Sequence, residues 1–152
     1  DRKAKQDGIW VNDIVDVGYK YQMNDISAAL GLAALEEIDE VLAYRKSLFD
    51  RYVANLPNVQ IVGRNANSSN WLMTILVDNR IELMNRLREH NIESAQVHYR
   101  NDRYSIFGGR VTTCPVMDQL EDKYLVLPLH TNITLDQVDF ICQVINKYLL
   151  IS

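Results

Sequence analysis

Residues 18–32 read GYKYQMNDISAALGL, and this stretch decides the fold because an aromatic, polar loop runs directly into a long helical pattern. Asn24 or Asp25 can cap the helix, since a short side-chain oxygen accepts a hydrogen bond from a backbone N–H that the first turn leaves free. Apolar residues then recur three and four positions apart as far as Tyr52, which predicts one amphipathic helix over about residues 24–54. At 1.5 Å per residue this helix would be roughly 45 Å long, more than a small domain can cover. We therefore expect it to reach from this domain to another part of the protein.

Length, composition and charge bound the class of protein. The chain has 152 residues, of which 47% are hydrophobic and 24% charged, so one domain with a substantial core is expected. A net charge of −4 gives no overall reason to expect a nucleic-acid or membrane partner. Cys114 and Cys142 are the only cysteines and form no CxxC pair, so neither a disulfide nor a zinc site is expected. A reducing cytoplasm is the simpler interpretation.

The pattern after the long helix predicts an α+β fold. Short apolar runs bounded by turn residues predict strands over about 59–62, 71–77, 92–97 and 124–127, with helices over about 79–91, 117–123 and 134–149. Thr134 and Gln137 have the spacing of a capping box at the start of the last helix. This order predicts a small, mostly antiparallel sheet with helices on one face, plus the long N-terminal helix.

The loop over 18–24 is the first stretch that could carry chemistry. Lys20 lies between Tyr19 and Tyr21, just ahead of a helix N-terminus. A lysine beside the positive end of a helix favours a bound anion such as phosphate. The alternative is that the two tyrosines pack and Lys20 is solvated.

The second such stretch, over residues 97–110, reads VHYRNDRYSIFGGR and includes His98, Tyr99 and Arg100. Three arginines and one aspartate give it a charge of +2 in a chain that is acidic overall. Arginines can clamp phosphates in bidentate fashion and tyrosines can stack on a base or sugar ring. The alternative is a solvated loop with an internal Arg–Asp pair. The histidines, cysteines and acidic residues show no catalytic triad or metal-ligand spacing, so we expect no catalytic residue and no metal site within this chain.

These motifs, taken in order, resemble the C-terminal part of the PLP-dependent nucleotide-sugar aminotransferases of the DegT/DnrJ/StrS family, which have the aspartate-aminotransferase-like fold type I. Residues 18–32 resemble that family's Gly-Tyr-Asn-Tyr-Arg-Met segment and the helix after it. Further similarities are Arg45 with Tyr52, the strand at 71–77, the segment 90–99, and Leu-Pro-Leu-His at 127–130 with the residues to 138. The resemblance covers nearly the whole chain.

The resemblance implies a fold, a reaction and a set of partners. Residues 1–23 would be an extended arm and loop from a missing large domain, and residues 24–152 the C-terminal small domain with its linking helix. Such enzymes use pyridoxal 5'-phosphate to move an amino group, usually from glutamate, to a keto-sugar nucleotide, and they work as homodimers. Their Schiff-base lysine belongs to the large domain. The chain begins with Asp1 rather than methionine, so we expect it to be part of a longer protein and inactive on its own.

The resemblance also assigns site residues. Lys20 stands where the family has an asparagine that reaches the PLP phosphate in the neighbouring subunit, so Lys20 is the implied cofactor contact. Gln22 replaces the family's arginine, and its role stays open. His98, Tyr99 and Arg100 would border the nucleotide-sugar pocket, with the identity of the nucleotide open.

Two alternatives remain from the sequence. One is a non-catalytic binding or assembly domain that has the same fold. The other lies within the family: a PLP-dependent sugar dehydratase in which a histidine replaces the Schiff-base lysine.

Overall fold

A computed structural model of the chain describes residues 19, 21, 23–63, 68–100, 102, 104, 108–109 and 114–150. The chain divides into two compact units, Asp1–Glu37 and Ile38–Ser152. The predicted cofactor contact, Lys20, and the neighbouring Gln22 lie outside the described residues.

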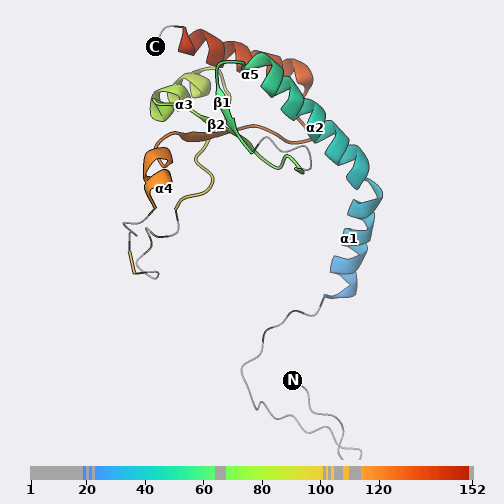
Figure 1. Cartoon of the computed structure of the whole chain (residues 1–152). Coiled ribbons are helices and arrows are strands. Elements are labelled where there is room, and N and C mark those ends of the chain that lie inside the picture. The colour runs from blue at the N-terminus through green and yellow to red at the C-terminus, as the bar shows by residue number, and fades with distance from the viewer. Residues whose placement is uncertain are drawn as a thin grey trace, which may run out of the picture. The chain divides into compact units, whose positions relative to one another are not determined.

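The first unit contains helix α1 (Asp25–Glu36), labelled in Figure 1. The predicted cap forms, because the Asn24 side chain accepts a hydrogen bond of 2.8 Å from the backbone N–H of Ser27. All but four of the twelve residues of α1 are apolar (the four are Asp25, Ser27, Gly31 and Glu36), yet none of its residues is buried. A helix that is mostly apolar but has no buried residue is typical of an element that packs against another molecule or domain.

The single helix predicted over 24–54 is instead two helices, with α2 (Ile38–Asn55) following α1 after Glu37. Glu37 has φ −107° and ψ −1°, which departs from helical geometry. Acidic residues explain the break: like charges three and four positions apart destabilise a helix, and four of them gather here: Glu36, Glu37, Asp39 and Glu40. The interruption places Asp39 and Glu40 in the first turn of α2, where the helix dipole favours negative charge.

The second unit is built on a three-stranded antiparallel sheet, in the order β1 (Gln60–Val62), β2 (Met73–Leu76), β3 (Tyr124–Leu127). The register places Ile75 between Ile61 and Leu125, and pairs Met73 with Leu127. Because side chains alternate along a strand, these residues share one face of the sheet. That face forms the core.

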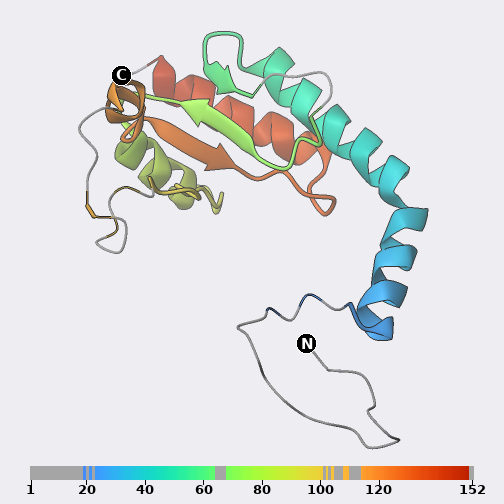
Figure 2. The ribbon, with the colours of Figure 1, turned by 60° about the horizontal axis from the view of Figure 1, so that its bottom comes forward.

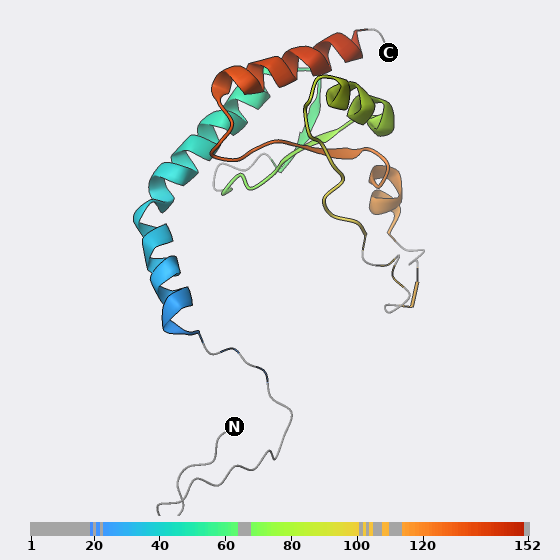
Figure 3. The same ribbon diagram turned by 180° about the vertical axis from the view of Figure 1, so that it is seen from behind.

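Helices cover this core face. α2 and α5 (Leu135–Leu149) lie side by side over the sheet, and α3 (Arg80–Glu89) packs against α5 (Figures 1 and 3). Figure 2 shows the strands lying across α5. The fully buried members of the core come from every one of these elements: Leu48, Tyr52, Met73, Ile75, Leu83, Leu87, Leu125, Val138 and Ile145. The predicted α+β class, with a small antiparallel sheet and helices on one face, is confirmed.

The strand predicted over 92–97 was wrong. Within this stretch only Ala95 pairs with the sheet, through an isolated bridge to Val126. Beyond Ala95, side-chain hydrogen bonds replace the backbone bonds of a strand. The Gln96 amide donates to the Tyr124 hydroxyl, and that hydroxyl donates to the carbonyl of His98. The chain therefore leaves the sheet after Ala95 and continues towards α4 (Pro115–Leu120), the short helix found where one was predicted over 117–123.

Both cysteines are free thiols, with Cys114 exposed and Cys142 buried in the core. Burial raises the pKa of the Cys142 thiol to about 12, which makes it a packing residue rather than a nucleophile. Among the described helices, none combines the length and the apolar character that crossing a bilayer requires.

Candidate substrate-binding site

The chain that leaves the sheet after Ala95 and the start of α4 line a wide, open hollow. Its volume is about 670 Å³, and it is lined by Val97, His98, Tyr99, Arg100, Asp102, Tyr104, Cys114 and Met117. This volume lies within the range of small-molecule sites, about 300–1,000 Å³. The lining includes His98, Tyr99 and Arg100, the three residues predicted from the sequence to border a ligand.

The aromatic side chains of the hollow are available to a ligand. Tyr99 is 57% exposed and Tyr104 49% exposed. Tyrosine rings at the rim of a hollow offer an apolar face together with a hydroxyl that can form hydrogen bonds. A sugar or a base, which has both flat apolar faces and polar edges, matches such a lining.

Trp71 is a neighbour of the hollow that the sequence analysis missed. It was assigned to the strand over 71–77, but β2 begins only at Met73, and the Trp71 ring is 59% exposed. Its ring centroid lies 5.7 Å from that of His98, with the two planes tilted by 47°. Trp71 therefore lies beside His98, which is a lining residue of the hollow.

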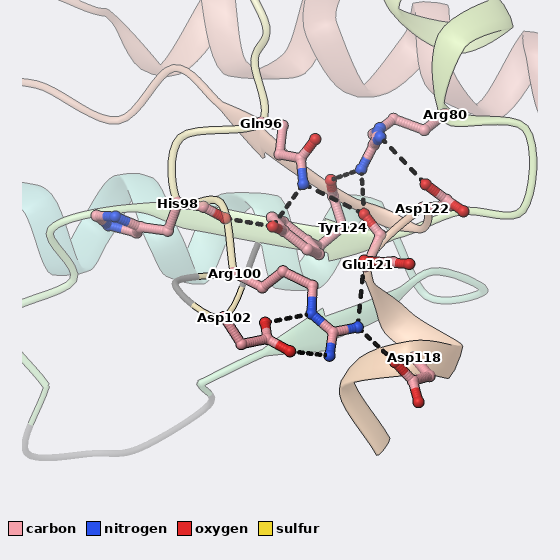
Figure 4. Close-up of polar contacts among 9 residues, drawn as sticks. All are labelled: Arg80, Gln96, His98, Arg100, Asp102, Asp118, Glu121, Asp122 and Tyr124. Atoms are coloured by element: carbon pink, nitrogen blue, oxygen red, sulfur yellow. Dashed lines mark hydrogen bonds and ion pairs between the residues drawn. The ribbon is translucent and has the colours of Figure 1, made fainter. Parts of the chain in front are cut away.

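Arg100 occupies a different environment from its two neighbours, because its side chain is only 3% exposed. Its guanidinium makes a bidentate pair with Asp102, with both distances at 2.6 Å. The Nη1 atom also bonds to Asp118 and lies 3.3 Å from Oε2 of Glu121 (Figure 4). The alternative of an internal Arg–Asp pair is therefore realised, but the pair is buried rather than solvated.

The carboxylates around Arg100 raise the pKa of its guanidinium, with the hydrogen bonds to Asp102 as the largest cause and those to Asp118 next. Arg100 therefore stays charged under all ordinary conditions. Its contacts join the loop that carries His98 and Tyr99 to α4, which contributes Asp118, and to Glu121 just beyond that helix. Arg100 thus fixes one wall of the hollow against the other.

A second set of contacts surrounds Tyr124 on β3, next to the Arg100 cluster (Figure 4). The backbone carbonyl of Glu121 accepts from Arg80 Nη1 at 2.7 Å and from Gln96 Nε2 at 3.2 Å. The Arg80 guanidinium also lies 5.7 Å from the centroid of the Tyr124 ring, within cation–π range. Because the side chain of Glu121 pairs with Arg100, this residue connects the two sets of contacts.

The other predicted site cannot be placed in the same detail. Lys20 lies outside the described residues, as do Arg103 and Arg110 of the second stretch. The two tyrosines that flank Lys20 are described: Tyr19 and Tyr21 are stacked, with ring centroids 5.4 Å apart, and are 79% and 85% exposed. They do not pack into a core, so their faces remain available for contact with another surface.

Comparisons with known proteins agree on one family. The sequence profile of the DegT/DnrJ/EryC1/StrS aminotransferase family matches residues 1–146. A GDP-perosamine synthase from Escherichia coli O157:H7 is 28% identical over 138 residues, which cover 87% of this chain and 38% of that protein.

Solved structures give the same result. The sugar aminotransferase CalS13 from Micromonospora echinospora superimposes with a TM-score of 0.80 at 27% identity, covering 89% of this chain and 38% of that one. The PMP form of Spr1654 from Streptococcus pneumoniae gives a TM-score of 0.80 at 29% identity, covering 93% of this chain and 39% of that one. The chain therefore spans well under half the length of these relatives. It belongs to the DegT/DnrJ/EryC1/StrS aminotransferase family, a fold type I PLP-dependent family.

Proposed function

We propose that this chain is the C-terminal part of a cytoplasmic sugar aminotransferase that uses PLP to transfer an amino group, from a donor such as glutamate, to a keto-sugar nucleotide. Family membership supports the reaction class, and the relatives are named for sugar chemistry. The observation that carries the substrate side of the proposal is the 670 Å³ hollow lined by His98 and Tyr99.

Within this hollow the three predicted residues take different roles. His98 and Tyr99 have exposed side chains and would contact the sugar nucleotide directly. Arg100 would act from behind, because its guanidinium is occupied by Asp102, Asp118 and Glu121. A rigid loop that leaves its aromatic side chains uncovered is suited to holding a substrate in one orientation.

PLP, when bound, is the group that carries the amino group between donor and acceptor. Covalent attachment of PLP needs a lysine amine in its uncharged form. Among the described residues, Lys46 pairs with Asp50 at 2.5 Å and Lys123 with Asp78 at 2.7 Å, while no lysine lines the hollow. We infer that the lysine that attaches PLP is not among the described residues. We propose that Lys20 contributes at most a contact to the cofactor phosphate in the neighbouring subunit.

The reaction itself is tested on the complete gene product that contains these residues. Relatives carry the names of GDP-, UDP- and dTDP-linked sugars, so the assay offers keto-sugar nucleotides with each of these nucleotides in turn. With PLP and glutamate present, mass spectrometry is expected to detect an amino-sugar nucleotide from one of them. Binding of a sugar nucleotide without turnover would instead favour a non-catalytic module. Loss of the sugar hydroxyl without amination would favour a dehydratase.

The chain of 152 residues alone is expected to gain no covalent PLP. Because Lys46 and Lys123 are ion-paired and no described lysine lines the hollow, incubation with equimolar PLP followed by borohydride should leave the intact mass unchanged. The complete protein, treated in the same way, is the positive control. A single stoichiometric PLP adduct on the isolated chain, mapped to one lysine, would show that an attachment site lies within these residues.

We further propose that the protein is a homodimer in which α1 and the preceding loop contact the second copy. The support is the apolar surface that this segment leaves uncovered. Its large exposed side chains are Tyr19, Tyr21, Met23, Ile26, Leu30, Leu32 and Leu35. In a two-fold dimer both copies contribute the same patch, so each of these apolar residues would be buried in both copies.

A further inference from the structure

Arg45 of α2 binds the backbone that carries the exposed Trp71 ring. Arg45 donates from Nε to the carbonyl of Asn70 at 3.2 Å and from Nη2 to the carbonyl of Trp71 at 2.7 Å. Asn70 itself is buried and has φ 48°, in the left-handed region that asparagine adopts more readily than most residues other than glycine. Two bonds from one rigid guanidinium therefore hold the backbone on both sides of this turn.

The backbone of His98 is held in a similar manner by a residue of β3, Tyr124. The Tyr124 hydroxyl donates to the carbonyl of His98 and accepts from Nε2 of Gln96, the latter at 2.5 Å. A hydroxyl has one proton to donate, and here Gln96 supplies the donor on its other side, which directs that proton to His98. His98 is thereby fixed although its segment belongs to no strand.

The two anchors bind carbonyl groups and leave both rings uncovered. Without anchors, two exposed rings on irregular segments would lose more conformational entropy on meeting than their contact returns. We infer that Arg45 and Tyr124 are positioning residues, which hold Trp71 against His98 beside the substrate hollow. A role of these rings in substrate binding rests on the proposed function. The placement of the two rings rests only on the contacts described above.

Fluorescence can report the ring placement directly. The sequence has two tryptophans, Trp10 and Trp71, so a Trp10→Phe background leaves Trp71 as the single indole. A ring that is held in one orientation keeps the polarisation of its emission, whereas an exposed ring that is free to change rotamer within nanoseconds loses part of it. His98→Gln, which removes the neighbouring ring, is therefore expected to lower the fluorescence anisotropy of Trp71.

The positioning variants are Tyr124→Phe, which removes only the hydroxyl, and Arg45→Gln. Each is expected to lower the anisotropy of Trp71 emission as His98→Gln does. Tyr44→Phe is the matched control for the tyrosine, because it deletes a 2.7 Å bond from a hydroxyl to the carbonyl of Ile133. Arg51→Gln is the control for the arginine, since Arg51 also lies on α2 but pairs with Asp139. Both controls should keep the anisotropy of the Trp10→Phe background.

A Tyr124→Phe protein whose Trp71 anisotropy equals that of the background would overturn the inference, and so would a His98→Gln protein with that anisotropy. In the complete protein, Tyr124→Phe is expected to raise KM for the sugar nucleotide more than it lowers kcat, whereas Tyr44→Phe should leave both unchanged. If Tyr124→Phe lowers the anisotropy but keeps its KM, the positioning role stands and the proposed substrate site does not. The two failures are therefore distinguishable.

Discussion

Replacing Arg100 with methionine is expected to free the segment around His98 and Tyr99 from α4. Methionine keeps the length and the apolar stem of arginine but removes the cation that Asp102, Asp118 and Glu121 share. Removing the guanidinium is destabilising, because the buried charge-assisted bonds that it makes to these carboxylates are lost. Hydrogen exchange of the backbone amides over residues 95–100 and 115–121 should therefore become faster.

The consequence for the proposed reaction is large. Displacing a substrate-positioning segment by 1 Å can cost about 10²-fold in rate. We therefore expect kcat/KM of the complete protein to fall by about 10²-fold in Arg100→Met. Arg100→Lys should recover only part of this loss, since a lysine retains the charge but cannot pair with Asp102 in bidentate fashion.

Arg86→Met is the matched control, because Arg86 makes a single pair with Glu89 on the surface of α3, at 2.9 Å. Exposed pairs of this kind contribute about 0–1 kcal/mol to stability. Equal exchange rates around α4 in the two variants would show that the buried cluster does not fix the loop. We expect Arg100→Met to have a lower kcat/KM and faster hydrogen exchange around α4. We expect Arg86→Met to change neither.

The parts of the fold that sequence predicts well are those whose signals are local. The last helix begins at its predicted cap, where Thr134 accepts from the N–H of Gln137 at 3.2 Å and the Gln137 side chain accepts from the N–H of Thr134 at 2.9 Å. Both partners lie three residues apart, so their spacing alone specifies the contact. The alternation in Met73–Leu76 likewise indicates a strand with one buried face.

Residues 92–97 were wrongly predicted to form a strand, because their conformation depends on contacts between residues that are distant in sequence. Its apolar composition is typical of a strand, but Gln96 and Tyr124 replace the ladder with side-chain bonds, and they lie 28 residues apart. The break at Glu37 is different in kind. The like charges that explain it are local, and the apolar stripe that continues past them concealed their effect.

The site was predictable in its residue types but not in its geometry. The composition of 97–110 predicted a ligand-binding stretch, and the described residues of this stretch that line the hollow are Val97, His98, Tyr99, Arg100, Asp102 and Tyr104. The burial of Arg100 was not visible, because two of its partners, Asp118 and Glu121, follow 18 and 21 residues later in the chain. Trp71 was missed for the same reason: nothing near it in the sequence shows that the chain brings His98 beside it.

The chain is expected to associate with a second copy of itself through α1. Ile26 and Ile81 offer a matched pair for testing this, because each is the second residue of its helix and each is largely exposed, at 76% and 63%. Glutamate is tolerated in the first turn of a helix, so neither Ile26→Glu nor Ile81→Glu should unfold its helix. Only Ile26 lies on the surface proposed to be buried between the two copies.

Burying an isoleucine side chain contributes about 1.5–3 kcal/mol, and each factor of ten in Kd corresponds to about 1.4 kcal/mol. Since a two-fold dimer loses both copies of the side chain, Ile26→Glu should raise Kd by at least about a hundredfold. Sedimentation equilibrium over a range of concentrations measures this for the wild type and both variants, and Tyr21→Asp is expected to weaken the dimer as well. A wild-type chain that remains a 17.6 kDa monomer at high micromolar concentration would refute the proposed interface. So would a dimer that Ile81→Glu weakens as much as Ile26→Glu, because the contact would then not be specific to α1.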